Sequence, residues 1–452
     1  MVGGLRVAIY DTPNVVGKKL SDALRNAGHD VLYSGPLNNQ TARSDADVWL
    51  TKWSFRLTGP NNILLTTRPR IGILTLSVGT DHIDESIIDE FHLKLSTCPT
   101  SYSNSVAEHA FALAFRILYG KSTIGPFSDK QTFSGEQIIF PNFSDKFAEA
   151  AVAHMLMQCR QLEASIGRAN AYNYARGDAP WGNQELASTT VGIFGHTRNA
   201  AKLAKILKFG FGARLIGLEV GENLAAFGIE EVPLDKLLSD SQYLFLCDDL
   251  FMISGARVPL TDSYVFDQDA LISGSKVAVL GTGRIGSIIA RIAKLGFGCD
   301  VVAYNRSEDN GLRELGVRYA DVPEAVQNAK IILVALPSTK LTEGLVSGKL
   351  LKAIPMAKSA PIIVNVARDV VIETEGVYRL ISNGAVAGYG TDVLPRDKSL
   401  WAGGEPDDLT RNFVLHDSVV ATPHEADASR QSLERLCVES IRKLSEFGGS
   451  YV

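Results

Sequence analysis

Short apolar stretches alternate with amphipathic ones over the first hundred residues. We expect strands at 5–10, 30–33, 47–50, 71–77 and 93–97, with a helix that ends near Arg25. Strands that alternate with helices are typical of an α/β domain with a mainly parallel sheet. A helix predicted from about Ser105 carries the stretch 106–115, which is apolar nearly all round and is expected to be buried between domains.

A second alternation, over 277–304, contains a glycine-rich turn. The apolar strand 277–280 leads into G-T-G-R-I-G (281–286), followed by an expected helix over 287–295 and a strand at 301–304. In such a turn the glycines allow a tight bend, a close approach of main chain to a pyrophosphate, and close helix packing. The N–H groups at the helix N-terminus face the phosphates. The pattern predicts dinucleotide binding at Gly281, Gly283, Arg284 and Ile285.

The end of the second strand bears on the choice of coenzyme. An NAD site usually has an acidic residue there, which binds the ribose 2′-hydroxyl. This chain has Asn305, Arg306 and Ser307 instead. An uncharged residue followed by a cation suits a 2′-phosphate, so we expect NADP, with NAD as the alternative. The other interpretation of Arg306 is a solvated surface cation.

The chain resembles itself at two offsets. Residues 191–218 align without a gap on 277–304, an offset of 86 (277 against 191). Agreement over about 28 positions favours an internal repeat over chance likeness of βα units. The earlier turn retains only Gly195 of the three glycines, so Cβ atoms would stand where a pyrophosphate must approach. A weaker sequence similarity relates V-A-E-H-A (106–110) to F-A-E-A-A (147–151). We therefore expect a degenerate Rossmann-like insert at 147–267 and a working NAD(P)-binding domain at 268–424.

Composition narrows the class of protein. The 452 residues are 45% hydrophobic and 21% charged, which is typical of a globular protein with two or three domains. A net charge of −5 does not indicate the excess of basic residues that is typical of proteins binding nucleic acid or an anionic membrane. Small molecules are therefore the expected partners. The five cysteines are widely spaced without CxxC, which predicts reduced thiols and no metal site. With no apolar run of about 18 residues, we expect a cytoplasmic location.

Segments outside 147–267 resemble the D-isomer-specific 2-hydroxyacid dehydrogenase family. The resemblance rests on six motifs: S-V-G-T-D-H-I-D (77–84), S-N-S-V-A-E-H (103–109), L-P-S-T (336–339), I-V-N-V-A-R-D (363–369), G-T-D-V (390–393) and A-T-P-H (421–424). It implies an α/β fold with a Rossmann-type nucleotide-binding domain and a flavodoxin-like substrate domain, here with the insert. The substrate domain would be 1–105, completed by 425–452, and 106–146 would be the interdomain helix and linker.

The resemblance also implies roles for individual residues. Arg368 would bind the substrate carboxylate and polarise the carbonyl, and His424 would be the acid/base. Reduction of a 2-oxo acid needs such a cation and such a proton donor beside the coenzyme. The main chain at Val78 and Gly79 would hold the carboxylate. The residues beside the coenzyme would be Leu336, Pro337 and Asp392.

Three departures from the family pattern concern the catalytic residues. Asp369 follows Arg368 where the family usually has glycine, and Glu425 follows His424 where the family tends to have an apolar residue. A family glutamate pairs with the histidine, and its position, five residues after Asp392, is here Asp397. Its side chain is about 1.5 Å shorter by ordinary bond lengths. The alternative partners are Glu405 and then Glu425.

Together these features predict an oxidoreductase that transfers a hydride between NAD(P)H and a small 2-oxo or 2-hydroxy acid. Lys52, at a strand end, is expected to face the cleft and to suit a phosphorylated or phosphonate-bearing acid. The alternative is a non-catalytic NAD(P)-binding regulator on the same fold. The insert is expected to pack on the working lobe like a second subunit, so the chain would be a homodimer or a pseudo-dimeric monomer.

Overall fold

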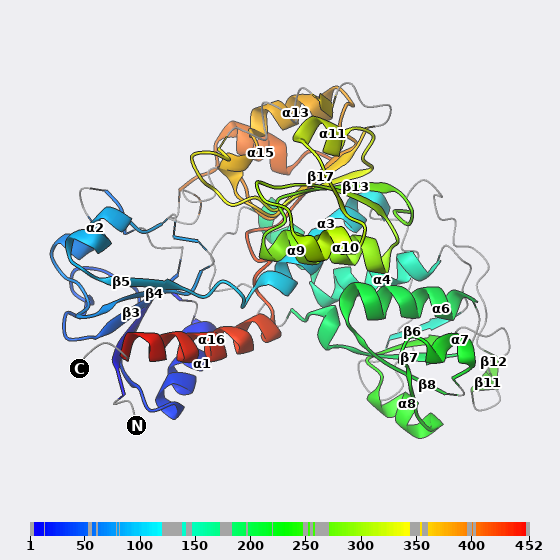
Figure 1. The fold of residues 1–452 in the computed structure, drawn as a ribbon, viewed down its shortest axis with the longest axis horizontal. Helices are drawn as coiled ribbons and strands as arrows, with labels where there is room; N and C mark the ends of the chain where they lie inside the picture. The colour runs from blue at the N-terminus through cyan, green and yellow to red at the C-terminus, as the bar shows by residue number, and fades with distance from the viewer. Residues whose placement is uncertain are drawn as a thin grey trace.

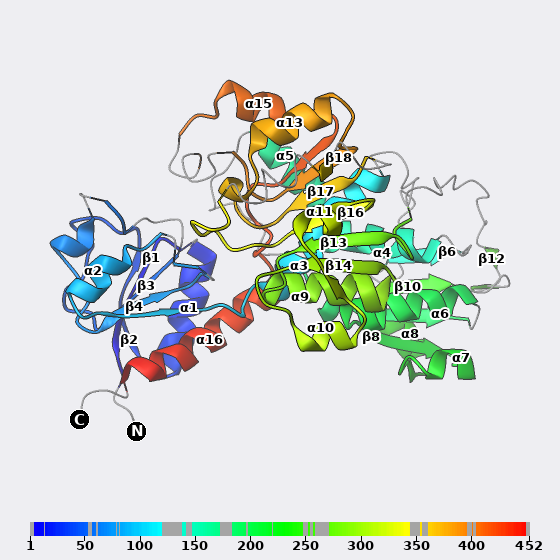
Figure 2. The same cartoon turned by 45° about the horizontal axis from the view of Figure 1, so that its top comes forward.

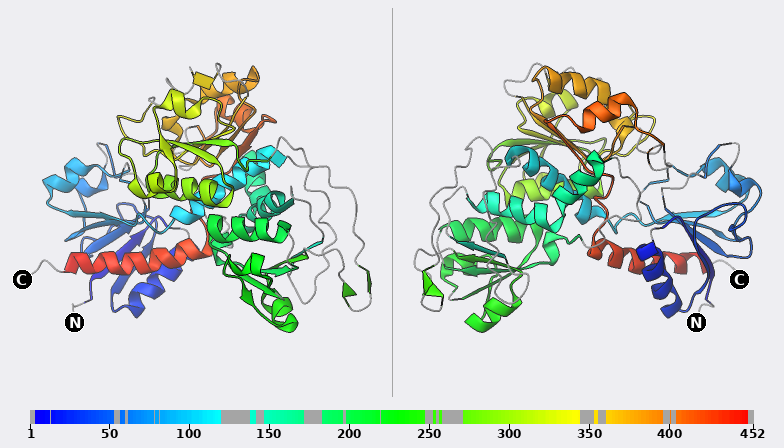
Figure 3. Two further views of the ribbon diagram at one scale, coloured as in Figure 1. Left: turned by 45° about the vertical axis from the view of Figure 1, so that its right-hand side comes forward. Right: turned by 180° about the vertical axis from the view of Figure 1, so that it is seen from behind.

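The structure, a computed structural model, describes residues 4–12, 14–52, 57–59, 62–77, 79–80, 82–119, 138–141, 147–171, 183–195, 198–218, 220–246, 252–253, 256–257, 271–343, 353–354, 360–395, 400 and 404–448. Three α/β units are visible in it (Figure 1). The N-terminal lobe stands to one side of the other two, which are stacked on each other (Figure 3).

The N-terminal lobe is a parallel sheet in the order β2-β1-β3-β4-β5. Its strands are β1 (Arg6–Tyr10), β2 (Asp30–Gly35), β3 (Val48–Thr51), β4 (Gly72–Thr75) and β5 (Lys94–Thr97). The helices around it are α1 (Asn14–Asn26), α2 (Glu85–Glu90) and α16 (Arg430–Gly448). This strand order is the flavodoxin-like one, which confirms the predicted fold class of the lobe. Helix α16 returns from the far end of the chain to lie along α1 (Figure 1).

The nucleotide lobe is a parallel sheet in the order β15-β14-β13-β16-β17-β18-β19. Its strands are β13 (Lys276–Leu280), β14 (Asp300–Tyr304), β15 (Arg318–Tyr319), β16 (Ile331–Val334), β17 (Ile362–Asn365), β18 (Gly388–Thr391) and β19 (Val419–Ala421). Its helices include α9 (Arg284–Arg291), η6 (Ile292–Gly296), α10 (Asn310–Glu314), α11 (Val322–Val326), α13 (Thr374–Ser382) and α15 (Asp408–Val414). The strand order reverses at β13, and such a switch point opens a crevice at the carboxyl ends of the strands.

The segment predicted as an insert (147–267) forms a parallel sheet in the order β6-β10-β7-β8-β9, whose edge strand β6 comes from the stretch 106–146 predicted as interdomain helix and linker. Its strands are β6 (Ile138–Pro141), β7 (Thr190–Phe194), β8 (Arg214–Leu218), β9 (Glu230–Glu231) and β10 (Tyr243–Leu246), with a hairpin of β11 (Met252–Ile253) and β12 (Ala256–Arg257). Its helices are α4 (Phe147–Cys159), α5 (Leu162–Asn170), η3 (Leu186–Ser188), α6 (Arg198–Lys205), η4 (Ile206–Phe211), α7 (Glu222–Ala225) and α8 (Leu234–Asp240). The order β9-β8-β7-β10 repeats β15-β14-β13-β16 of the nucleotide lobe.

A helical layer joins the insert to the nucleotide lobe (Figure 2). It contains α3 (Ser103–Tyr119), which packs on α4 and α9, while η4 packs on η6. At the contact of η4 with η6, Gly210 lies opposite Gly296, and the rings of Phe211 and Phe297 are 6.2 Å apart. Both pairs are separated by the same 86 residues as the repeat in the sequence.

Two buried glutamate side chains form hydrogen bonds across this layer in opposite directions. Glu108 of α3 accepts hydrogen bonds from the N–H groups of Leu186 and Ala187, just before β7 (2.7 and 3.2 Å). Glu149 of α4 accepts from the N–H groups of Ile272 and Ser273, just before β13 (2.5 and 3.1 Å). The contact is therefore reciprocal, which is the pattern of a two-fold interface.

Several predicted boundaries differ from the observed ones. The nucleotide-binding helix begins at Arg284 rather than 287, because the last residues of the glycine-rich loop already form the first turn of the helix. The C-terminal helix begins at Arg430 rather than about 426, because the main chain of 425–426 is hydrogen-bonded to Asp392 instead. Cys98, Cys159, Cys299 and Cys437 are buried and free, as predicted, and Cys247 lies outside the described residues.

Candidate active site

A cavity of about 510 Å³ lies at the carboxyl ends of the nucleotide-lobe strands and faces the N-terminal lobe. It joins segments far apart in the sequence, as expected of a site at a topological switch point. Nine residues predicted for the site line it: Gly79, Gly283, Arg284, Ile285, Leu336, Pro337, Arg368, Asp392 and His424.

The glycine turn has the geometry of a dinucleotide cradle. Gly281 has φ +97°, and a Cβ there would lie 2.8 Å from the carbonyl oxygen of Ala335. A Cβ on Gly286 would collide with the carbonyl oxygen of Gly281. Gly283 is the N-cap of α9, and a Cβ there would project into open space within the cavity. The residues therefore fit a pyrophosphate held by main-chain N–H groups at a helix N-terminus.

The residues after β14 lie at the surface. The amide of Asn305 donates to the carbonyl oxygen of Ser307 (2.8 Å), which closes a short turn. Arg306, within this turn, is exposed. Because β14 is hydrogen-bonded to β13, this cation stands beside the strand that enters the glycine turn.

Arg368 is set by a hydrogen-bonded turn at the end of β17. Asn365 donates to the carbonyl oxygen of Arg368 (3.1 Å) and accepts from the N–H of Ala367 (3.0 Å). The guanidinium donates to the carbonyl oxygen of Ala367 (2.8 Å). The side chain lines the cavity, where its planar fork suits a carboxylate.

His424 follows β19 and also lines the cavity. Its backbone has φ 55°, in the left-handed region, and its N–H donates to the carbonyl oxygen of Thr422 (3.0 Å). Such a conformation costs of order 1–3 kcal/mol in a residue other than glycine and persists only where neighbouring contacts enforce it.

Asp392, at the end of β18, supplies one set of those contacts. Its carboxylate accepts from the N–H groups of Glu425 and Ala426 (2.9 Å each) and from the hydroxyl of Thr422 (2.6 Å). The residue is buried, and this burial raises its pKa to about 6, while the charge of His424 and the hydrogen bonds act in the opposite direction. Asp392 therefore holds the loop 422–426 as well as lining the cavity.

Three acidic residues are candidate partners of His424. Asp397 lies outside the described residues. Glu405 is 89% exposed and lies 3.5 Å from Arg411 at the surface. Glu425 is buried, and each of its two carboxylate oxygens accepts a hydrogen bond from Arg168. The carboxylates of Glu405 and Glu425 are thus engaged elsewhere.

Lys52 is buried rather than solvated, and it is paired. Its Nζ lies 3.0 Å from Oδ2 of Asp427 and 5.5 Å from the ring centroid of Tyr102. Asp427 and Tyr102 line the cavity, so Lys52 stands behind them. Lys52 was predicted to face the cleft; in the structure its ammonium group is paired with Asp427, which lines the cavity. Val78 lies outside the described residues.

The sequence model described as "D-isomer specific 2-hydroxyacid dehydrogenase, NAD binding domain" matches residues 152–250 and 264–426, more than half of the chain. The chain belongs to this family. The resemblance expected from the motifs at 363–369, 390–393 and 421–424 is therefore confirmed.

Curated relatives of this 2-hydroxyacid dehydrogenase family member match over part of their length. A 2-hydroxyacid dehydrogenase homolog of Schizosaccharomyces pombe is 27% identical over 181 residues, which are 39% of this chain and 54% of the relative. A glyoxylate reductase of Pyrococcus furiosus is 32% identical over 38% of this chain and 48% of its own. A D-lactate dehydrogenase of Streptococcus pyogenes is 32% identical over 35% and 49%. The chain spans about half the length of these relatives.

Solved structures share the fold. A D-lactate dehydrogenase from Aquifex aeolicus, in complex with NAD and lactic acid, aligns with a TM-score of 0.54 at 19% identity, over 98% of this chain and 95% of that one. The pyruvate reductase of Chlamydomonas reinhardtii aligns with a TM-score of 0.56 at 18% identity, over 99% of this chain and 97% of that one.

No helix within the described residues has both the length and the apolar character needed to span a membrane. The described residues also contain no His/Cys/Asp/Glu group suited to a metal ion.

Sequence reasoning missed the charged residues that cross between the lobes. Arg160 and Arg168, from the insert, reach the loop that carries His424. Glu108 and Glu149 accept hydrogen bonds across the helical layer. The similarity between 106–110 and 147–151 contained both glutamates, and a charged residue in an otherwise apolar helix was the available signal.

Proposed function

We propose that this chain transfers a hydride between NAD(P)H and a small 2-oxo or 2-hydroxy acid in the cavity described above. The observation that carries the proposal is that Arg368 and His424 line the same cavity as the glycine turn. A non-catalytic regulator would need the coenzyme cradle but neither of these side chains, so the enzyme is the better account.

The roles follow from the position of each group. The turn 281–286 and the N-terminus of α9 hold the coenzyme, which supplies the hydride when bound. Arg368 binds the substrate carboxylate and withdraws electron density from the adjacent carbonyl. Main-chain N–H groups at Val78 and Gly79 bind the same carboxylate as Arg368. His424 donates a proton to the carbonyl oxygen as the hydride reaches the carbon, and accepts it in the reverse direction.

We expect NADPH to be preferred over NADH. The residue directly after β14, where an acidic side chain would bind a ribose 2′-hydroxyl, is Asn305, and Arg306 beside it is exposed. A 2′-phosphate would accept charge-assisted hydrogen bonds from this guanidinium.

The substrate class is a small, unphosphorylated acid. Relatives are named for glyoxylate and D-lactate, and the negative charge of Asp427 at the cavity offsets the positive charge of Lys52 behind it. Because its charge is offset in this way, Lys52 would add little to the binding of a doubly charged acid. Asp397 remains the proposed partner of His424.

We also propose the following domains. A substrate domain (1–105, completed by 425–452) and an NAD(P)-binding domain (268–424) enclose the site, with 106–146 as interdomain helix and linker. The segment 147–267 is a degenerate second nucleotide-binding unit that takes the place of a partner subunit. Its strand order and the reciprocal contacts of Glu108 and Glu149 support this assignment.

A coenzyme oxidation assay tests the function. Glyoxylate, pyruvate, longer 2-oxo acids and phosphonate-bearing acids would each be offered with NADPH and with NADH. The proposal predicts turnover with at least one unphosphorylated 2-oxo acid and its loss in Arg368→Ala and His424→Ala. Turnover that survives both substitutions would reject the assigned site.

A further inference from the structure

Two arginines of the insert reach the loop that carries His424. Arg160 donates to the carbonyl oxygens of Ala426 (2.8 Å) and Glu425 (3.5 Å). Arg168 donates to both carboxylate oxygens of Glu425 (2.6 and 2.7 Å). The insert therefore holds both the main chain and the side chain of the residue that follows His424.

Neither contact is a solvated surface pair. Arg160 is fully buried, and its acceptors in the described part of the chain are uncharged oxygens, including Ser105 Oγ at 2.8 Å. A buried guanidinium is unfavourable unless hydrogen bonds satisfy it, and here Nη1 and Nη2 of Arg160 are hydrogen-bonded, while Nε has no partner among the described residues. The side chain of Glu425 is only 2% exposed, and Arg168 is the cation paired with it in the described part of the chain, so its loss would leave a buried charge without that counter-ion.

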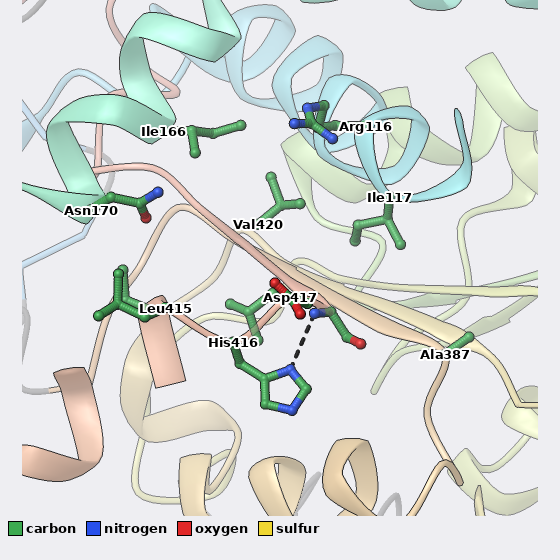
Figure 4. A pocket seen from close by; sticks show the side chains of 12 residues that line it. Arg116, Ile117, Ile166, Asn170, Ala387, Leu415, His416, Asp417 and Val420 are labelled. Carbon is green, nitrogen blue, oxygen red and sulfur yellow. Dashed lines mark hydrogen bonds between the residues drawn. The ribbon is translucent and has the colours of Figure 1, made fainter. Parts of the chain in front are cut away.

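Helix α5, which carries Arg168, is also docked beside the strand that leads to His424. It packs on β19. Arg116 of α3 is paired with Glu163 of α5 (2.5 Å). A separate cavity of about 350 Å³ is lined here by Ile166 and Asn170 of α5 and by Val420 of β19 (Figure 4). The position of α5 is thus tied to that of β19.

The peptide after His424 is held from two sides. Asp392, in the nucleotide lobe, accepts the N–H groups of Glu425 and Ala426, and Arg160, in the insert, binds their carbonyl oxygens. These contacts enforce the left-handed backbone of His424 (φ 55°), and this backbone directs where the imidazole lies.

We propose that Arg160 and Arg168 are positioning residues of the dehydrogenase site, and that the insert aligns His424 for proton transfer. The inference rests on the proposed function. It assigns the insert a part in turnover although its own glycine turn has lost two glycines. The two arginines touch neither the glycine turn nor Arg368, so their loss should affect proton transfer and leave coenzyme binding unchanged.

The test compares four variants with the full chain. Arg168→Ala should lower kcat by about 10- to 100-fold, since a displacement near 1 Å costs up to that much, with the Kd for NADPH unchanged. Arg168→Lys retains a charged donor to Glu425 and should recover most of kcat. Arg214→Ala, which breaks an exposed pair with Glu230 in the same insert, is the matched control and should have the kcat of the unmodified chain.

The double variant Arg168→Ala/Glu425→Gln separates alignment from folding. Removing the unpaired carboxylate should restore the thermal midpoint that Arg168→Ala loses, while kcat stays low. Recovery of kcat together with the midpoint would overturn the proposal, as would an unchanged kcat in Arg168→Ala. If the unmodified chain binds NADPH yet reduces no 2-oxo acid, the proposed function fails, and this inference fails with it.

Discussion

Gly210 and Gly296 meet where η4, in the segment predicted as an insert, packs on η6 of the nucleotide lobe. A Cβ on Gly210 would lie 3.1 Å from the Cα of Gly296, and one on Gly296 would lie 2.9 Å from the Cα of Gly210. The two glycines are 86 residues apart, the offset of the sequence repeat. Each half of the repeat thus places the same residue against its counterpart.

Enlarging either glycine should separate the two halves. Gly296→Ala should lower the free energy of unfolding by about 1–3 kcal/mol, because backbone atoms on the opposite side must move. Calorimetric unfolding would measure this loss. Gly167→Ala in α5 is the matched control, because its Cβ meets nothing within 4 Å, and it should be neutral or slightly stabilising.

The buried carboxyl of Glu108 should make stability depend on pH. Burial, and secondarily the charge of Glu185, raises its pKa from 4.5 to about 8. Because the folded-state pKa is the higher one, its contribution is complete below about pH 4.5 and is lost as the pH rises to about 8. Relative to Glu108→Gln, the unmodified chain should lose stability across that window in chemical unfolding at several pH values. A constant difference between the two proteins would contradict the burial effect.

Asp392→Asn should impair turnover more than coenzyme binding. An amide in place of the carboxylate turns an NH₂ group toward an N–H of residue 425 or 426, which costs about 1–3 kcal/mol for an unsatisfied donor. The loop with His424 should then shift, so kcat should fall while NADPH still quenches intrinsic fluorescence with unchanged Kd. Equal losses in both quantities would indicate that Asp392 serves the coenzyme instead.

Arg306 should select between the two coenzymes. Arg306→Ala should raise the KM for NADPH by about 10- to 100-fold, because it removes one or two hydrogen bonds to a charged group. The KM for NADH should be nearly unchanged. Arg313→Ala, which removes an exposed pair with Glu308, is the control. Equal effects on both coenzymes would show that the 2′-phosphate is bound elsewhere.

Much of the fold could be predicted because its signals are local. The glycines at 281, 283 and 286 are required by contacts within a single strand-turn-helix unit, and the repeat at offset 86 is visible in the printed sequence. The strand ends that carry Arg368 and His424 were likewise marked by apolar runs that precede them.

The ion pairs that hold the site residues in place could not be predicted, because they are tertiary contacts. Arg168 and Glu425 are 257 residues apart and meet only once two lobes have docked. Lys52 follows an apolar strand like any cleft residue, and nothing in the sequence near it indicates that Asp427 will pair with it. Charge patterns alone do not distinguish such buried pairs from surface ones.

The most direct test of the central claim is a crystal structure of the chain with NADPH and oxamate, an unreactive analogue of a 2-oxo acid. The account predicts the pyrophosphate against Gly283 and the N-terminus of α9, the oxamate carboxylate on Arg368, and its carbonyl oxygen within hydrogen-bond distance of His424. Coenzyme bound at the turn that follows β7, or oxamate bound away from Arg368 and His424, would contradict it.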